Sequence, residues 1–178
     1  ADLVPLLDAT VLVERDRSSC GELGDVGARG EGAFAAADVV AEREFRLKFR
    51  TGGLAADLFP HAHALARWID AALDRETPFK CTAGLHHAVR HTTSKGFERP
   101  VDQHGFLNVL LATRLAFDGT PTPEVVETLE RRDGAALAED ARGADLAGAR
   151  RWFTSFGSCS VSEPLDDLIN LGLLEEPS

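Results

Sequence analysis

Two lysines occupy matching positions in two short apolar segments of the sequence. Lys48 lies in segment 45–50, where apolar and basic residues alternate, and Lys80 lies in segment 79–82. Only Lys48, Lys80 and Lys95 among the 19 basic residues are lysines. Unlike arginine, a lysine kept from water or set beside other cations can lose its proton and attack a carbonyl carbon, forming a Schiff base. The residue types therefore predict that Lys48 and Lys80 take part in Schiff-base formation.

Three basic side chains are expected to lie near Lys48, namely Arg46, Arg50 and Lys80. Nearby positive charge favours an uncharged amine, so these residues are candidates for activating Lys48 as a nucleophile. The same residues allow two other interpretations. Both lysines bind an anionic ligand, or both form structural ion pairs with a carboxylate such as Glu14.

Strands are the elements that would position the lysines. Strands are predicted at 10–14, 45–50, 79–82 and 151–156, and helices at 33–42, from Pro60 to the stop at Thr77-Pro78, and from Ser162 to a glycine cap at Gly172. Strand, helix, strand with short connections is typical of βα units, whose strands run parallel. The expected fold class is α/β, with about four parallel βα units of TIM-barrel type, or half a barrel.

We expect a single domain over residues 1–178, with a mainly helical insertion at about 88–150. Within the insertion, the apolar positions from Phe106 to Leu115 predict one helix, and Thr122-Pro123 is a typical helix start.

The two faces of each strand are predicted by alternation, because successive side chains point to opposite sides. In a barrel one face packs on helices and the other lies inside. The predicted helix-facing residues are Phe45, Leu47, Phe49, Phe79 and Cys81, and the predicted interior residues are Arg46, Lys48, Arg50, Lys80 and Thr82.

Glycine-containing loops follow three of the predicted strands. Glycine lets backbone N–H groups approach a ligand, and a helix N-terminus favours an anion. The candidate substrate or anion-binding residues in these loops are Thr51, Gly52 and Gly53, then Thr82 and Gly84, then Gly157, Ser158 and Ser160. For the last loop, an ordinary capped turn is an equal alternative.

Histidines gather after the third predicted strand. His86, His87, Arg90 and His91 follow it, and His104 stands at the start of the next helix. If the segment were helical, His87 and His91 would share a face and could bind a metal with His104 or Asp102. Acid/base catalysis by His86, ligand contact by Arg90, and a purely structural role are the alternatives.

Composition restricts the partners. The net charge of −10 argues against nucleic acid and anionic membranes, and a small anionic carbonyl metabolite fits better. No apolar run is long enough for a membrane span and no secretory signal is evident, so we expect a cytoplasmic protein. Its three cysteines suggest neither a disulfide framework nor a thiolate zinc site, and no nucleotide-binding motif is complete. We therefore expect no cofactor.

These motifs resemble the C-terminal half of the deoxyribose-phosphate aldolase family of class I aldolases. Segments 48–52, 80–84 and 155–160 are similar in order and spacing to its sixth, seventh and eighth strands, and 11–14 to its fifth. The resemblance implies that Lys48 forms the Schiff base, Lys80 tunes it and the 155–160 segment binds phosphate. The same motifs resemble those of a bacterial family of unassigned function.

The leading hypothesis is a Schiff-base lyase acting on a small carbonyl compound that bears a phosphate or carboxylate. Lys48 and Lys80 would be catalytic, and Glu14 or His86 would move protons. The alternatives are a metal-assisted hydrolase or isomerase using His86, His87 and His104, and a noncatalytic anion-binding or assembly module. Half a barrel exposes strand edges, so we expect a homo-oligomer or a missing N-terminal half-barrel as partner.

Overall fold

The computed structural model describes residues 37–38, 40–42 and 45–176. The predicted strand at 10–14, with Glu14, lies outside the described residues. Of the helix predicted at 33–42, residues 37–38 and 40–42 are helical.

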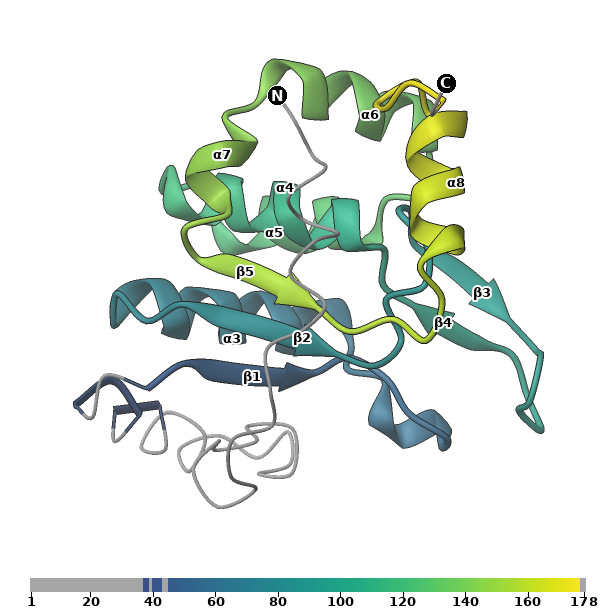
Figure 1. Ribbon diagram of the computed structural model, residues 1–178. Coiled ribbons are helices and arrows are strands. Elements are labelled where there is room, and N and C mark those ends of the chain that lie inside the picture. Colours follow the sequence, from purple (N-terminus) through teal and green to yellow (C-terminus); the bar gives the residue numbers. More distant parts are fainter. Residues whose placement is uncertain (1–36, 39, 43–44, 177–178) are drawn as a thin grey trace.

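A three-stranded parallel sheet forms the centre of the fold (Figure 1). Strands β1 (Leu47–Arg50), β2 (Phe79–Thr82) and β5 (Phe153–Phe156) lie in the order β1-β2-β5. The α/β class and the parallel strands are therefore confirmed. The described strands do not close into a barrel.

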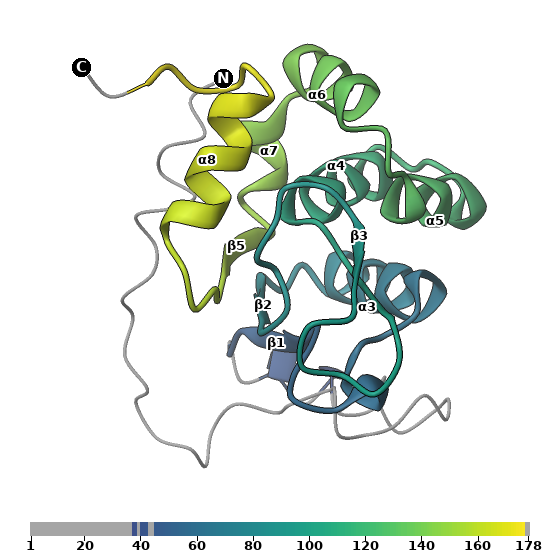
Figure 2. The same cartoon turned by 90° about the vertical axis from the view of Figure 1, so that its right-hand side faces the viewer.

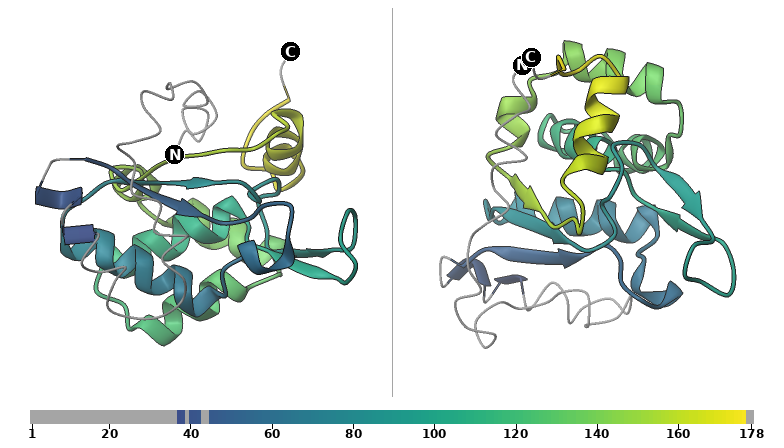
Figure 3. Two further views of the ribbon diagram at one scale, coloured as in Figure 1. Left: turned by 90° about the horizontal axis from the view of Figure 1, so that it is seen from below. Right: turned by 45° about the vertical axis from the view of Figure 1, so that its right-hand side comes forward.

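One face of the sheet is buried by aromatic packing against helices. Leu47, Phe49, Phe79 and Phe153 are fully buried. Phe79 stacks between Phe49 and Phe153, with ring centroids 4.8 and 5.5 Å apart, and Phe49 also contacts Trp68. Seen from below, the helices gather on this side of the strands (Figure 3, left). Alternation then places Lys48 and Lys80 on the opposite face, as predicted.

Helices make up most of the remaining structure. After a short 3-10 helix (Ala56–Leu58), they are α3 (Ala62–Asp74), α4 (Phe106–Phe117), α5 (Thr122–Glu130), α6 (Gly134–Gly143), α7 (Leu146–Ala149) and α8 (Ser162–Asn170). Figure 2 shows α8 on one side of the molecule and α3 and α5 on the other, and Figure 1 shows α7 and α8 at opposite ends of it. Every residue of α4 from Phe106 to Thr113 is buried, so its apolar surface is wider than the predicted stripe. In the described part of the chain, no helix has the length and apolar character needed to cross a membrane.

The predicted insertion is not wholly helical. It begins with an antiparallel hairpin of β3 (His91–Thr93) and β4 (Val101–Gln103), in which Thr92 pairs with Asp102. His87 and His91 therefore do not share a helical face, and that expectation was wrong.

Some predicted boundaries also need correction. β1 begins at Leu47, so Arg46 precedes the strand and is exposed, and Phe45 is 44% exposed instead of facing the helices. β5 begins at Phe153, and its pairing with β2 is irregular between Phe79 and Lys80. Gly172 follows α8 with a positive φ of 64°, which confirms the predicted glycine cap.

Candidate functional site

Lys48 and Lys80 are direct neighbours in the sheet. They are register partners in the parallel β1–β2 pair, and Lys80 partners Ser155 on β5. Both lysines are half-buried, whereas their strand neighbours Leu47 and Phe79 are fully buried. Adjacent strands are about 4.8 Å apart, so the two ammonium-bearing side chains leave the sheet side by side. Toward the carboxyl ends, Arg50 and Thr82 are the next register pair on the same face of the sheet.

The glycine loops after β1 and β2 pack against each other. A Cβ on Gly52 would lie 2.7 Å from Cα of Gly84, and a Cβ on Gly84 would lie 2.7 Å from the carbonyl oxygen of Thr51. Gly84 also has a φ of 78°, and Ala83 before it has a φ of 64°. These glycines are explained by a tight turn and close backbone approach.

The remaining candidates in these two loops are also engaged in packing. The Thr51 side chain is fully buried, and its hydroxyl donates to the carbonyl of Ala83 over 2.6 Å. A Cβ on Gly53 would overlap the side chain of Leu58. The contacts of Thr51 and Gly53 are therefore explained by packing at the edge of the sheet.

The loop between β5 and α8 largely satisfies its own polar groups. Ser160 Oγ accepts the N–H of Glu163 over 3.2 Å, and Ser158 Oγ accepts the N–H of Ser160 over 3.3 Å. Pro164 in the first turn of α8 has no N–H, and the Glu163 side chain adds negative charge there. Gly157 donates to the carbonyl of Cys81 over 3.0 Å. The capped-turn alternative explains these contacts better than an anion site does.

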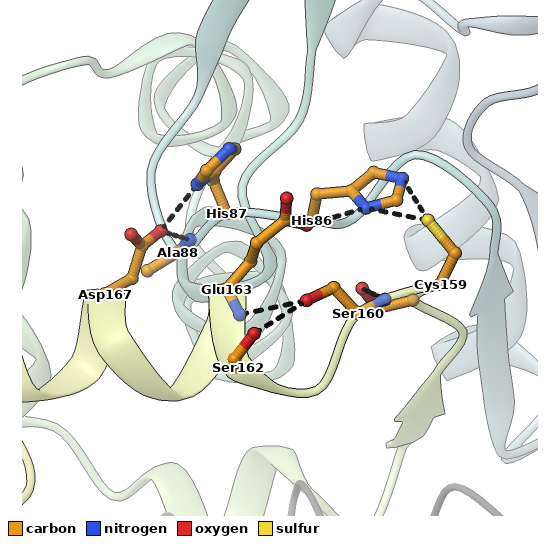
Figure 4. A network of polar contacts seen from close by, with 9 residues as sticks. His86, His87, Ala88, Cys159, Ser160, Ser162, Glu163 and Asp167 are labelled. Atoms are coloured by element: carbon orange, nitrogen blue, oxygen red, sulfur yellow. Dashed lines mark hydrogen bonds and ion pairs between the residues drawn. The ribbon is translucent and has the colours of Figure 1, made fainter.

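His86 contacts a thiol and a carboxylate from the opposite loop. Its Nδ1 lies 3.3 Å from Oε2 of Glu163 and 3.5 Å from Sγ of Cys159 (Figure 4). Cys159 is exposed, whereas Cys81 is buried and burial raises the pKa of its thiol. His86 thus lies just beyond the carboxyl end of β2, next to the chain that follows β5.

His87 points to the other side of the same loop. Asp167 of α8 accepts the backbone N–H of Ala88 over 2.7 Å and lies 3.1 Å from Nδ1 of His87 (Figure 4). The His87 ring also meets His91 edge-on, with centroids 4.5 Å apart. His86 and His87 are therefore held by different partners.

His104 is a structural residue. Its side chain is fully buried, its Nε2 donates to the carbonyl of Pro60 over 2.8 Å, and its Nδ1 accepts from Arg90 over 3.1 Å. Arg90 also pairs with Asp102 and is only 10% exposed, so it anchors the hairpin. Among the described residues, no group of three or more histidine, cysteine and carboxylate side chains is arranged to hold a metal ion. The proposed set of His86, His87 and His104 is not brought together.

The buried state of His104 predicts a loss of stability in mild acid. Burial and the neighbouring Arg90 lower the pKa of His104 from 6.5 to about 4. As pH falls from 6.5 to 4.5, His104 becomes protonated in the unfolded chain but stays neutral in the folded protein. This difference lowers the free energy of unfolding by about 2–3 kcal/mol. Urea denaturation of wild type and His104→Gln at both pH values should show this fall in wild type only. His63→Gln, at an exposed position, should keep it. Equal pH dependence in His104→Gln would contradict this assignment.

Asn108 of α4 and Gly105 just before it position the histidine loop, which is the connection 83–90 between β2 and β3. Asn108 is fully buried, and its Oδ1 accepts the N–H of Arg90 over 2.9 Å. Its Nδ2 donates to the carbonyls of Thr128 and Arg131, each over 2.8 Å. A Cβ on Gly105 would overlap the backbone of Ala88 and Val89.

Sequence reasoning missed Glu163 and Asp167, which are the carboxylate partners of His86 and His87. Glu163 and Asp167 are four residues apart and therefore lie on one face of α8. That spacing was the available signal, because the face meets the loop that carries His86 and His87.

The fold and the site define an α/β protein whose parallel sheet presents a lysine pair, with histidine-bearing loops at the carboxyl edge. Comparison of the chain with family models, curated proteins and solved structures finds no match.

Proposed function

We propose that this protein is a Schiff-base lyase of the class I aldolase type, with a small anionic carbonyl compound as substrate. The observation that supports it is the register pairing of Lys48 and Lys80 on the sheet face opposite the phenylalanines. A lysine amine is the group that attacks a carbonyl carbon to form a Schiff base, and here a second lysine lies directly beside it.

In the proposed reaction, the Nζ of Lys48 attacks the carbonyl carbon and the carbonyl oxygen leaves as water. The resulting iminium ion accepts the electron pair of the bond between its α and β carbons as that bond breaks, which leaves an enamine on Lys48, and the second fragment leaves as an aldehyde after losing its hydroxyl proton. A proton then adds to the enamine carbon, and water hydrolyses the iminium ion, which releases the first fragment and restores the amine of Lys48. Lys80 lies beside Lys48 in register. His86, at the carboxyl edge, is the candidate for carrying the proton through water.

The choice of Lys48 as the nucleophile and Lys80 as the tuning residue rests on the family resemblance. The proposal also treats the three described strands as part of a (β/α) barrel completed by a second subunit or by further chain. Arg50 and Thr82, which follow the lysines in register, are the candidates for contacting the substrate's anionic group.

Borohydride trapping tests the proposal, because it reduces an imine to a stable secondary amine. Wild type is incubated with small aldehydes, ketones and 2-oxo acids in turn, and adducts are measured by intact mass. We expect one adduct per chain with at least one probe, and a loss of at least about tenfold in Lys48→Arg. Lys95→Arg, on the β3–β4 hairpin, is the matched control and should trap like wild type.

Lys80 provides a second arm of the same test. Lys80→Arg keeps the positive charge beside Lys48, and Lys80→Gln removes it. We expect slower trapping in Lys80→Gln than in Lys80→Arg. If no probe gives an adduct, or if Lys48→Arg traps as well as wild type, the lyase proposal is wrong.

A further inference from the structure

A pocket of about 420 Å³ lies between the histidine loop and α8, apart from the lysine pair. Its lining includes His87, Val89, His91, Arg132, Asp167 and Leu171. The volume is in the range of small-molecule sites. We call this the His87 pocket.

Positive charge is concentrated at one wall of the His87 pocket. Arg90 and Arg132, which both line it, share the single carboxylate of Asp102, at 3.2 and 2.7 Å. The Thr92 hydroxyl and Arg132 hold the pKa of Asp102 at about 2, so this carboxylate stays ionised. One carboxylate therefore faces two guanidinium groups. The side chain of Arg132 remains 46% exposed, and among the described residues its Nη groups contact Asp102 and Thr92. A guanidinium group has five N–H donors, so donors remain for a ligand.

The opposite wall carries two imidazoles whose Nδ1 atoms are already engaged. His87 Nδ1 faces Asp167, and His91 Nδ1 donates to the carbonyl of Val89 over 3.3 Å. The Nε2 atoms are left for a ligand, and each becomes a donor when its ring is protonated. Asp167 also accepts the N–H of Ala88, so its negative charge is partly neutralised by the protein.

We propose that the His87 pocket binds a small organic anion. The anionic group, a carboxylate or a phosphate, lies between Arg132 and the Nε2 atoms of His87 and His91. The side chains of Val89 and Leu171 contact a short apolar part of the ligand. This site is independent of Schiff-base formation at Lys48, because none of its lining residues belongs to β1 or β2.

The affinity should increase as the pH falls. Each imidazole that takes up a proton adds a positive charge and a donor. His87 is faced by Asp167 and His91, and His91 is faced by His87, His86 and Asp167. Burial and the neighbouring His87 lower the pKa of His91, so His91 gains its charge only below its ordinary range. An anion bound between the rings favours their protonated forms, and the same linkage makes binding tighter in mild acid.

Titration followed by the histidine ring resonances in NMR tests the site in the full chain. The probes are inorganic phosphate, butyrate and, as a neutral control, butanol. We expect saturable shifts of His87 and His91 with a Kd on the order of 1 mM for at least one anion, with tighter binding at pH 6 than at pH 8. Butyrate alone would identify carboxylates, and phosphate alone would identify phosphates. Butanol should give no saturable shift.

Variants connect the binding to the named residues. Arg132→Gln and His91→Gln should each weaken binding by roughly tenfold, since each removes a charge-assisted contact. Arg151→Gln, at an exposed position between α7 and β5, is the control and should bind like wild type. Absence of saturable shifts with both anions, or unchanged affinity in Arg132→Gln, would overturn the proposal. Neither outcome of the anion titration changes the expected borohydride trapping at Lys48. The anion-binding proposal and the lyase proposal can therefore be contradicted independently.

Discussion

Gly105→Ala should destabilise the protein by about 3 kcal/mol or more in urea denaturation. Gly105 precedes α4 with a φ of −91°, a conformation that any residue adopts, so backbone strain is not the cause. The cause is space, because a methyl group there would overlap the carbonyl oxygen of Ala88, the backbone of Val89 and the amide of Asn108. Backbone atoms cannot give way as a flexible side chain can. The loop with His86 and His87 would have to move away from α4.

Gly143→Ala is the matched control for this substitution. Gly143 ends α6, and a Cβ there would have no neighbour within 4 Å. Because alanine has the higher helix propensity, we expect unchanged stability or a gain of up to about 1 kcal/mol. If Gly105→Ala stayed within about 1 kcal/mol of wild type, the histidine loop would not pack on α4 as described.

Asn108→Asp should destabilise the protein by about 3–5 kcal/mol at neutral pH. The substitution keeps the shape of the side chain and replaces the donor Nδ2 by an acceptor. Two carbonyl oxygens, of Thr128 and Arg131, would then face a buried carboxylate. These two carbonyl oxygens would lose their hydrogen-bond donor, and the new carboxylate would be buried away from water. Urea denaturation at pH 7 measures the effect.

Thr113→Val provides the comparison for Asn108→Asp. Thr113 is also fully buried on α4, and its hydroxyl donates only to the carbonyl of Val109 in the same helix, over 2.7 Å. Losing this single local hydrogen bond should cost about 1 kcal/mol. Equal effects of the two substitutions would mean that Asn108 does not connect the histidine loop to the end of α5.

The lysine pair was predictable because it depends on a period of two along a strand. Alternation in 45–50 and 79–82 assigned the faces of Leu47, Lys48 and Lys80 correctly, and short connections indicated parallel strands. Phe45 and Arg46 do not follow the predicted alternation, because β1 begins at Leu47, two residues later than predicted.

The hairpin could not be predicted, because its strands have three residues each and are mostly polar. What holds it is long-range pairing of Asp102 with Thr92, Arg90 and Arg132. The glycines after β1 and β2 were read as ligand-binding positions. The structure explains these glycines by the packing of Gly52 against Gly84. This contact joins two loops that are far apart in the chain, so neither loop's sequence indicates it.

The most direct test of the Schiff-base account is to locate the borohydride adduct by peptide mass mapping. The chain has only three lysines, and Lys95 serves as an internal reference because it is exposed on the hairpin. We predict that an adduct formed at low probe concentration lies on Lys48, at least about tenfold above Lys95. Equal labelling of the exposed and half-buried lysines, or label on Lys95 alone, would contradict the account.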